Sequence, residues 1–171
     1  MTRSTDFPGL TRRLASLMYE SLLVGTLWLV AVAAFTPILA MGNHAPLLEW
    51  LHRLFVAGVL FGYFGYCWVK SGQTLAMKPW RLKVAMPDGR PLSWLQAGVR
   101  FGVAMVLFVG VPVLSYITWL PSLGSPKLAA WAALAWWLLP LLWVFMDNDK
   151  QFLHDRLAGT RIFLLAKGER A

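Results

Sequence analysis

Three charged side chains stand within or beside long apolar segments, and one of them is an acid that could exchange a proton or bind a cation. Arg13 and Glu20 open the first of these segments, and Arg100 lies near the start of the third. An ionised group at the middle of a membrane helix costs roughly 2.5 to 3.5 kcal/mol, so a retained charge usually faces a partner, water or a substrate. Arg13 and Glu20 are seven residues apart, whereas helix ion pairs need a spacing of three or four. A routine ion pair along the helix is therefore not expected, and Glu20 should come within salt-bridge reach of Arg100, the favoured partner, or of Arg13 in the folded protein. Asp155 should reach Arg13 or another basic group on the cytoplasmic side.

The chemistry open to such a cluster has two interpretations. A carboxylate drawn partly out of water has its pKa raised, and a nearby arginine lowers the pKa again. Glu20 with Arg13, Arg100 and Asp155 could therefore bind and release a proton or a small cation. In the alternative interpretation, the same charges only clamp the first and third helices to the carboxyl-terminal tail.

The composition is that of an integral membrane protein. Of 171 residues, 58% are hydrophobic and 14% charged, whereas about a quarter of the residues of soluble domains are charged. The net charge of +8 lies in loops between apolar runs, which indicates lipid headgroups as the partner and excludes nucleic acid. With one cysteine, Cys67, neither a disulfide framework nor a zinc cluster is available. We expect no metal, no cofactor and no enzymatic activity, because no phosphate loop or metal-ligand motif occurs.

Four segments are long and apolar enough to span a membrane, at about 14–40, 47–69, 94–120 and 127–146. Pro46 suits the first turn of the second helix, and Ser93 with Gln96 has capping-box spacing for the third. In the fourth, Pro140 predicts a bend. Two placements of Glu20 stay open: buried in a tilted helix, or at the interface behind an amphipathic lead-in over 14–19.

The connections carry a small sheet. Residues 80–85 alternate between apolar and basic, which is the period of a strand, and the β-prone run 162–165 near the carboxyl terminus is its expected partner. The predicted fold is therefore one all-α membrane domain over 1–171, with four transmembrane helices and a cytoplasmic strand pair. The strands belong to a cytoplasmic loop over 70–93 and a cytoplasmic tail over 147–171.

Charge counting sets the predicted orientation. The amino-terminal segment, the middle loop with the start of the third helix, and the tail hold three, six and five Lys or Arg residues, against two on the other side. Basic loops stay in the cytoplasm, so both termini should be cytoplasmic. The fourteen are Arg3, Arg12, Arg13, Lys70, Lys78, Arg81, Lys83, Arg90, Arg100, Lys150, Arg156, Arg161, Lys167 and Arg170, and the two are Arg53 and Lys127.

Glycines mark predicted sites of close helix packing. Small residues four apart let another backbone approach within a membrane. The neighbour is either a helix of the same chain or a second copy in a homodimer. The positions are Gly58, Gly62 and Gly65 in the second span and Gly98 and Gly102 in the third.

These features together resemble the RDD family of small membrane proteins, which is named for one arginine and two aspartates. The arginine would be Arg13 and one aspartate Asp155, while Glu20 replaces the other and keeps its charge. The resemblance covers nearly the whole chain and rests on residues 72–75 (Gly-Gln-Thr-Leu) and 153–161 (Leu-His-Asp-Arg-Leu-Ala-Gly-Thr-Arg). Ala76 stands where the family usually has glycine. Supporting positions are Gln73, Thr74, Arg100, His154 and Arg156.

The resemblance implies a multi-pass protein of the bacterial inner membrane, and transport, including sodium/proton exchange, has been proposed for some members. A scaffold is the alternative from a different class. Its basic face, with Arg81, Lys83, Arg156 and Arg161, would dock a cytoplasmic partner or anionic lipid.

Overall fold

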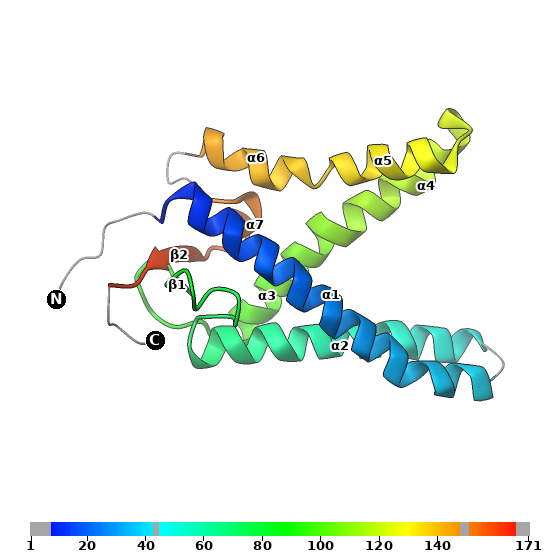
Figure 1. Cartoon of the computed structure of the whole chain (residues 1–171), viewed down its shortest axis with the longest axis horizontal. Helices are drawn as coiled ribbons and strands as arrows, with labels where there is room; N and C mark the ends of the chain where they lie inside the picture. The colour runs from blue at the N-terminus through cyan, green and yellow to red at the C-terminus, as the bar shows by residue number, and fades with distance from the viewer. Residues whose placement is uncertain (1–7, 43–44, 148–150, 167–171) are drawn as a thin grey trace. The chain divides into compact units, whose positions relative to one another are not determined.

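The computed structural model describes residues 8–42, 45–147 and 151–166 of the chain. The chain packs into two compact units (Figure 1), of which the first comprises Met1–Lys83 with Leu164–Ala171 and the second Val84–Phe163. The expectation of one domain over 1–171 stays a prediction. Arg3, Lys150, Lys167 and Arg170, four of the cations counted above, lie outside the described residues.

Within the part of the chain that the structure describes, four helical stretches are long and apolar enough to cross a membrane, as predicted. They run over Leu10–Met41, Pro46–Lys70, Trp94–Leu123 and Pro126–Met146. Six of the eight ends lie one to four residues beyond the predicted ones, while the start of the third stretch and the end of the fourth lie where predicted.

In the first unit, helices α1 (Leu10–Met41) and α2 (Pro46–Lys70) lie side by side (Figure 1). Their contact includes Phe35 of α1, whose ring stacks on His52 at 5.3 Å and lies 5.4 Å from Phe55. Pro46 occupies the first turn of α2 as predicted, since its missing N–H would have no helical partner there.

The segment that follows α2 is packed, although it has little regular structure. Gly72 ends the helix with φ of 69°, a left-handed conformation that glycine adopts without steric cost. Buried Gln73 donates from Nε2 to the carbonyl oxygen of Leu82 at 2.6 Å, which fixes the start of the first strand. Trp80 lies edge-on against Tyr19 of α1, with ring centroids 6.2 Å apart. Segment 71–81 is thereby tied to both α1 and the sheet.

The predicted strand pair is confirmed. Strand β1 (Leu82–Ala85) pairs with β2 (Arg161–Leu164), and the backbone N–H of Leu165 donates to the carbonyl of Arg81 at 2.8 Å. Leu82 and Val84 are 1% and 0% exposed, so alternate side chains of β1 point into the protein. The division between the units passes through this sheet.

The second unit is helical apart from its share of the sheet. It contains α3 (Trp94–Met105), the π-helical segment η1 (Val106–Gly110), α4 (Val111–Leu123), α5 (Pro126–Ala135), α6 (Leu138–Met146) and α7 (Leu153–Leu157). The predicted capping box is present: Ser93 accepts from the N–H of Gln96, and Gln96 accepts from the N–H of Ser93. Helix α4 packs on α5, and α7 packs on both α3 and α6.

The glycines that were predicted to mark close helix packing differ in their surroundings. Gly65 is buried, but outside the neighbouring backbone of the same helix no described atom lies within 4 Å of a Cβ built at Gly58, Gly62, Gly98 or Gly102. Packing of these four against a second copy stays a prediction. In the fourth stretch, Trp136 and Trp137 form a turn between α5 and α6 with right-handed helical backbone angles, and the bend at Pro140 stays a prediction.

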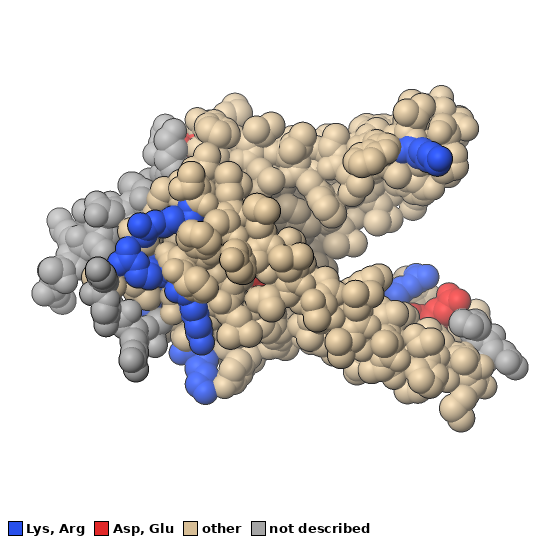
Figure 2. Space-filling model, in the orientation of Figure 1, with Lys and Arg blue, Asp and Glu red and all other residues tan. Residues whose placement is uncertain are grey.

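Charged side chains are sparse over the long helices. Within the first unit, Glu49 and Arg53 lie in the first two turns of α2, while Lys70, Lys78, Arg81 and Lys83 gather at the other end of this helix and beyond it. Figure 2 shows long uncharged stretches along the helices of both units. This pattern is typical of helices that face hydrocarbon along their middle.

Candidate functional site

The first polar cluster, called the α1–α2 cluster, joins Glu20, Tyr63 and Thr74. The phenol of Tyr63 in α2 donates to Oε1 of Glu20 at 3.2 Å. The hydroxyl of Thr74 donates to the second carboxylate oxygen of Glu20 in a short hydrogen bond. Each oxygen of this carboxylate thus accepts from a hydroxyl group, and α1 is bound to α2 and to segment 71–81.

The same hydroxyl groups also hold segment 71–81. Tyr63 Oη accepts from the backbone N–H of Leu75 at 3.3 Å, and Thr74 Oγ1 accepts from that of Met77 at 3.3 Å. Thr74 is 1% exposed, so its hydroxyl needs partners within the protein. The carboxylate of Glu20 therefore completes a network that orders this segment against α1 and α2.

The second polar cluster, called the α3–α7 cluster, is built on a buried ion pair. Arg100 Nη1 of α3 lies 2.5 Å from Oδ1 of Asp155 in α7, and the two side chains are only 4% and 1% exposed. Arg100 also donates to the hydroxyl of Thr160. Thr160 in turn donates through its backbone N–H to the carbonyl oxygen of Asp155 at 3.0 Å. The short helix α7 is thereby fixed to α3.

His154 lies beside this ion pair between two aromatic rings. Its ring stacks on Phe152 and meets Phe108 edge-on, both with centroids 5.7 Å apart, and its Nε2 lies 3.4 Å from Asp155 Oδ1. Burial lowers the pKa of the His154 imidazole below its usual value. The carboxylate of Asp155 opposes this lowering of the pKa, and the cation of Arg100 adds to it. The imidazole is therefore kept neutral near pH 7.

Two more motif residues have defined surroundings. Arg156, predicted as a supporting residue, lies with Nε 3.8 Å from a carboxylate oxygen of Asp147, at the end of α6. Arg13 is 2% exposed within α1, so the first unit buries a cation as well as holding the carboxylate of Glu20.

The structure groups these charges differently from our first expectation. Arg100 forms its ion pair with Asp155, whereas Glu20 accepts from two hydroxyl groups of its own unit. The α1–α2 and α3–α7 clusters belong to different units. The pairing of Glu20 with Arg100 or Arg13 stays a prediction, and the basic group that Asp155 meets is Arg100.

Two members of the clusters were not found from the sequence. Tyr63 follows no motif, and the only signal was a phenol well inside an apolar span, where its hydroxyl requires a partner. Thr160 belongs to the closing motif but has an ordinary residue type. Gln73 and Thr74, expected only from the family resemblance, support β1 and contact Glu20. Ala76 is absent from the positive-φ residues, so no left-handed backbone is required there.

The two clusters differ in what they could do chemically. The α1–α2 cluster joins a carboxylate to two hydroxyl groups, a set of oxygens able to pass on a proton. In the α3–α7 cluster, a permanent cation lies against a buried carboxylate, an arrangement that suits a structural tie.

Comparison with known proteins identifies the family. The model of the RDD family matches residues 7–159, most of the chain. Neither the curated proteins nor the solved structures gave a match. The matched range includes Arg13, Glu20 and Asp155, and it places them in a chain with four apolar helices of spanning length. The chain therefore belongs to the RDD family.

Proposed function

We propose that the protein is a multi-pass scaffold of the bacterial inner membrane, with both termini and the loop over 70–93 in the cytoplasm. The excess of fourteen Lys and Arg residues over two on the opposite side supports this orientation. In this role the two polar clusters hold segment 71–81 and α7 in place on the helices.

The length of α1 supports a structural role for Glu20. Its 32 residues span roughly 48 Å, whereas the hydrocarbon core is about 30 Å thick. An untilted helix of this length would extend beyond the hydrocarbon by about a dozen residues. Glu20 bonds to Thr74, which follows α2, and neighbouring Tyr19 touches Trp80. These contacts favour the interfacial placement of Glu20 over burial in mid-membrane.

The observation that carries the proposal is a basic surface in the first unit, beside the α1–α2 cluster. Lys70 and Lys78 are exposed, and Arg12, Arg81 and Lys83 are partly exposed. This surface adjoins the ends of α1 and α2, where lipid headgroups begin. Each Lys or Arg near an anionic leaflet contributes about 1 kcal/mol at low ionic strength. We propose that anionic phospholipid headgroups are its partner.

The test compares the thermal stability of the protein in nanodiscs with and without phosphatidylglycerol. The triple variant Lys78→Gln, Arg81→Gln, Lys83→Gln should lose most of the stabilisation by anionic lipid. In the parent, added salt should reduce this stabilisation because salt screens the charges. The matched control Arg53→Gln, Lys127→Gln carries its changes on the other side and should respond like the parent. Equal stabilisation of the triple variant and the parent would refute the proposed partner.

A second function is favoured by one observation, the two hydroxyl groups on Glu20. We propose as the alternative that Glu20 exchanges a proton during cation transport, with Tyr63 and Thr74 as its immediate partners. Proteoliposomes with a pH-sensitive dye inside test this alternative. Cation-driven proton flux that is lost in Glu20→Gln and retained in Glu20→Asp would favour the transporter. Flux equal to that of empty liposomes would favour the scaffold.

A further inference from the structure

The third apolar stretch is interrupted by a π-helical segment with an identifiable cause. Pro112 lacks the N–H that would bond to the carbonyl of Phe108, four residues earlier. Instead, the N–H of Val111 reaches back five residues to Val106, and η1 forms over Val106–Gly110. Single π-helical turns of this kind occur mostly within α-helices at functional sites.

The fourth stretch is interrupted by a second proline. Pro140 cannot donate to the carbonyl of Trp136, so the N–H of Leu139 bonds to this oxygen at 3.2 Å in a tighter turn. Helix α5 accordingly ends at Ala135, and α6 begins at Leu138.

One hydrogen bond joins the two interruptions. The indole Nε1 of Trp137, in the turn between α5 and α6, donates to the carbonyl oxygen of Phe108 at 2.9 Å. This is the carbonyl that Pro112 deprives of its helical donor. A neighbouring helix that satisfies a freed carbonyl is the expected solution within a membrane, where water is absent.

The helices beyond this junction form one packed body. Gly124, with φ of 62°, allows the turn between α4 and α5. Ala129 and Ala133 of α5 are 0% and 4% exposed, and small residues four apart let α4 pack closely. We call this α4–α5 body the outer hairpin.

The helices on the other side of the junction form a second body. Helix α7 packs on both α3 and α6, and the buried pair of Arg100 and Asp155 fixes it to α3. Helix α5 packs mainly on α4, whereas α6 packs on α7. The segments that link the two bodies are η1 and the turn at Trp136 and Trp137.

We propose that η1 and the helical turn at Trp136–Trp137 form one coupled hinge, about which the outer hairpin moves against the body of α3, α6 and α7. Because the hydrogen bond from Trp137 to Phe108 joins η1 to the turn between α5 and α6, a bend in one should be accompanied by a bend in the other. Hinges of this kind concentrate a backbone change in a few residues at the ends of elements.

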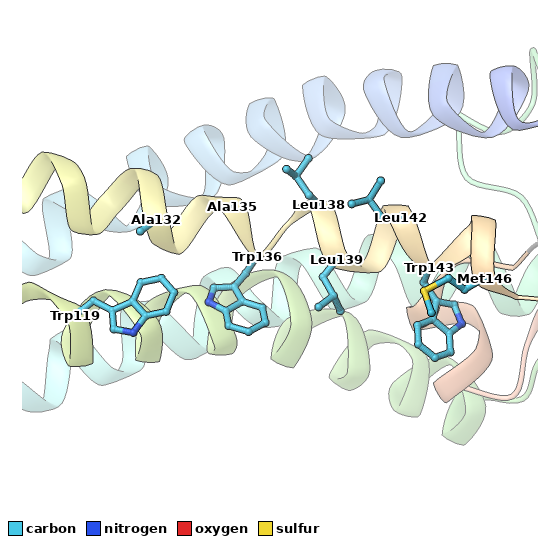
Figure 3. Close-up of a pocket in the computed structure, with 9 residues that line it drawn as sticks. All are labelled: Trp119, Ala132, Ala135, Trp136, Leu138, Leu139, Leu142, Trp143 and Met146. Atoms are coloured by element: carbon cyan, nitrogen blue, oxygen red, sulfur yellow. The ribbon is translucent and has the colours of Figure 1, made fainter. Parts of the chain in front are cut away.

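The movement would change the width of an apolar groove of about 560 Å³ (Figure 3). Its lining comes from both bodies: Trp119, Ala132 and Ala135 from the outer hairpin, Trp136 from the turn, and Leu138, Leu139, Leu142, Trp143 and Met146 from α6. Trp136 stacks on Trp119 at 6.3 Å, beside the hinge. Because lipid tails are as apolar as this lining, the hydrophobic effect does not oppose opening within a membrane.

The test measures distances between spin labels by pulsed electron resonance on the full chain in nanodiscs, in a Cys67→Ala background. Labels at Ser122 and Leu157, both exposed, report on the hinge. Labels at Val113 and Leu128 report on the interior of the outer hairpin. A rotation of about 10° would move the far end of a 13-residue helix by roughly 3 Å. Trp137→Phe removes the indole donor. In this variant the distribution of distances between the labels at Ser122 and Leu157 should become wider by roughly 3 Å.

The matched control is Trp131→Phe, which makes the same change in α5 at a side chain that is 73% exposed. This control should leave both label pairs unchanged. Pro112→Ala restores a donor for the carbonyl of Phe108 and should narrow the Ser122–Leu157 distribution. An unchanged Ser122–Leu157 distribution in Trp137→Phe would overturn the proposal. Broadening of the Val113–Leu128 pair to the same extent would also overturn it, since the outer hairpin would then not move as one body.

Discussion

Removing the charge of Asp155 should destabilise the protein more than most single substitutions. Asp155→Asn keeps the size of the side chain but leaves the guanidinium of Arg100 buried without its counter-charge. The two side chains are 4% and 1% exposed with their charged atoms 2.5 Å apart, so water cannot replace the lost partner. Breaking a buried ion pair in this way costs about 3 to 5 kcal/mol. Stabilities of single domains are about 5 to 15 kcal/mol, so this loss would be a large fraction of the total.

A double-mutant cycle separates the ion pair from other effects. Arg100→Met removes the cation that faces the carboxylate of Asp155 and should also destabilise the protein. The double variant Arg100→Met, Asp155→Asn removes both charges, so its cost should be smaller than the sum of the single costs by about 2 to 3 kcal/mol. Equilibrium unfolding in mixed micelles, followed by tryptophan fluorescence, measures all four proteins. The chain has ten tryptophans to report on the transition.

The control for this experiment is a surface pair of the same chemistry. Asp88 and Arg90 lie 2.6 Å apart in the turn before α3, but both side chains are largely exposed. Solvent screens such pairs, so Asp88→Asn should leave the unfolding free energy within error of the parent. Additive single costs at Arg100 and Asp155, within about 0.5 kcal/mol, would refute the reasoning that the two charges depend on each other.

Three further predictions concern individual side chains. Because the pKa of His154 is lowered in the folded protein, the unfolded chain takes up a proton first as the pH falls below about 6.5. The contribution of neutral His154 to stability is therefore present above about pH 6.5 and is lost as the pH falls below it. Between pH 7 and pH 5.5, the melting temperature of His154→Phe should fall less than that of the parent. Ser93→Ala removes the side-chain cap of α3 and should cost about 1 kcal/mol in equilibrium unfolding. Thr74→Val leaves one oxygen of Glu20 without its hydroxyl donor, and limited proteolysis within 71–81 should become faster in this variant than in the exposed control Ser122→Val.

Helix starts and strand positions could be predicted because they depend on local chemistry. Pro46 and Ser93 act within one turn of their own helices, and alternation of side chains marks β1 whatever it pairs with. The effect of proline depends instead on neighbours. Pro37 lies inside a continuous α1, whereas Pro112 and Pro140 accompany a π-helical segment and a turn. The sequence contains nothing at Pro112 itself that identifies Trp137 as the donor to Phe108.

The partners of the buried charges could not be predicted for a related reason. A charge in an apolar segment shows that a partner is needed, but it does not show which one, since a cation or a pair of hydroxyl groups can stabilise a carboxylate. Glu20 is reached by Thr74 because Gly72 turns the chain back at the end of α2. Asp155 meets Arg100 because α7 packs on α3. The acids of the family motif are thus divided between the two units. Glu20 holds segment 71–81 against α1 and α2, and Asp155 holds α7 against α3.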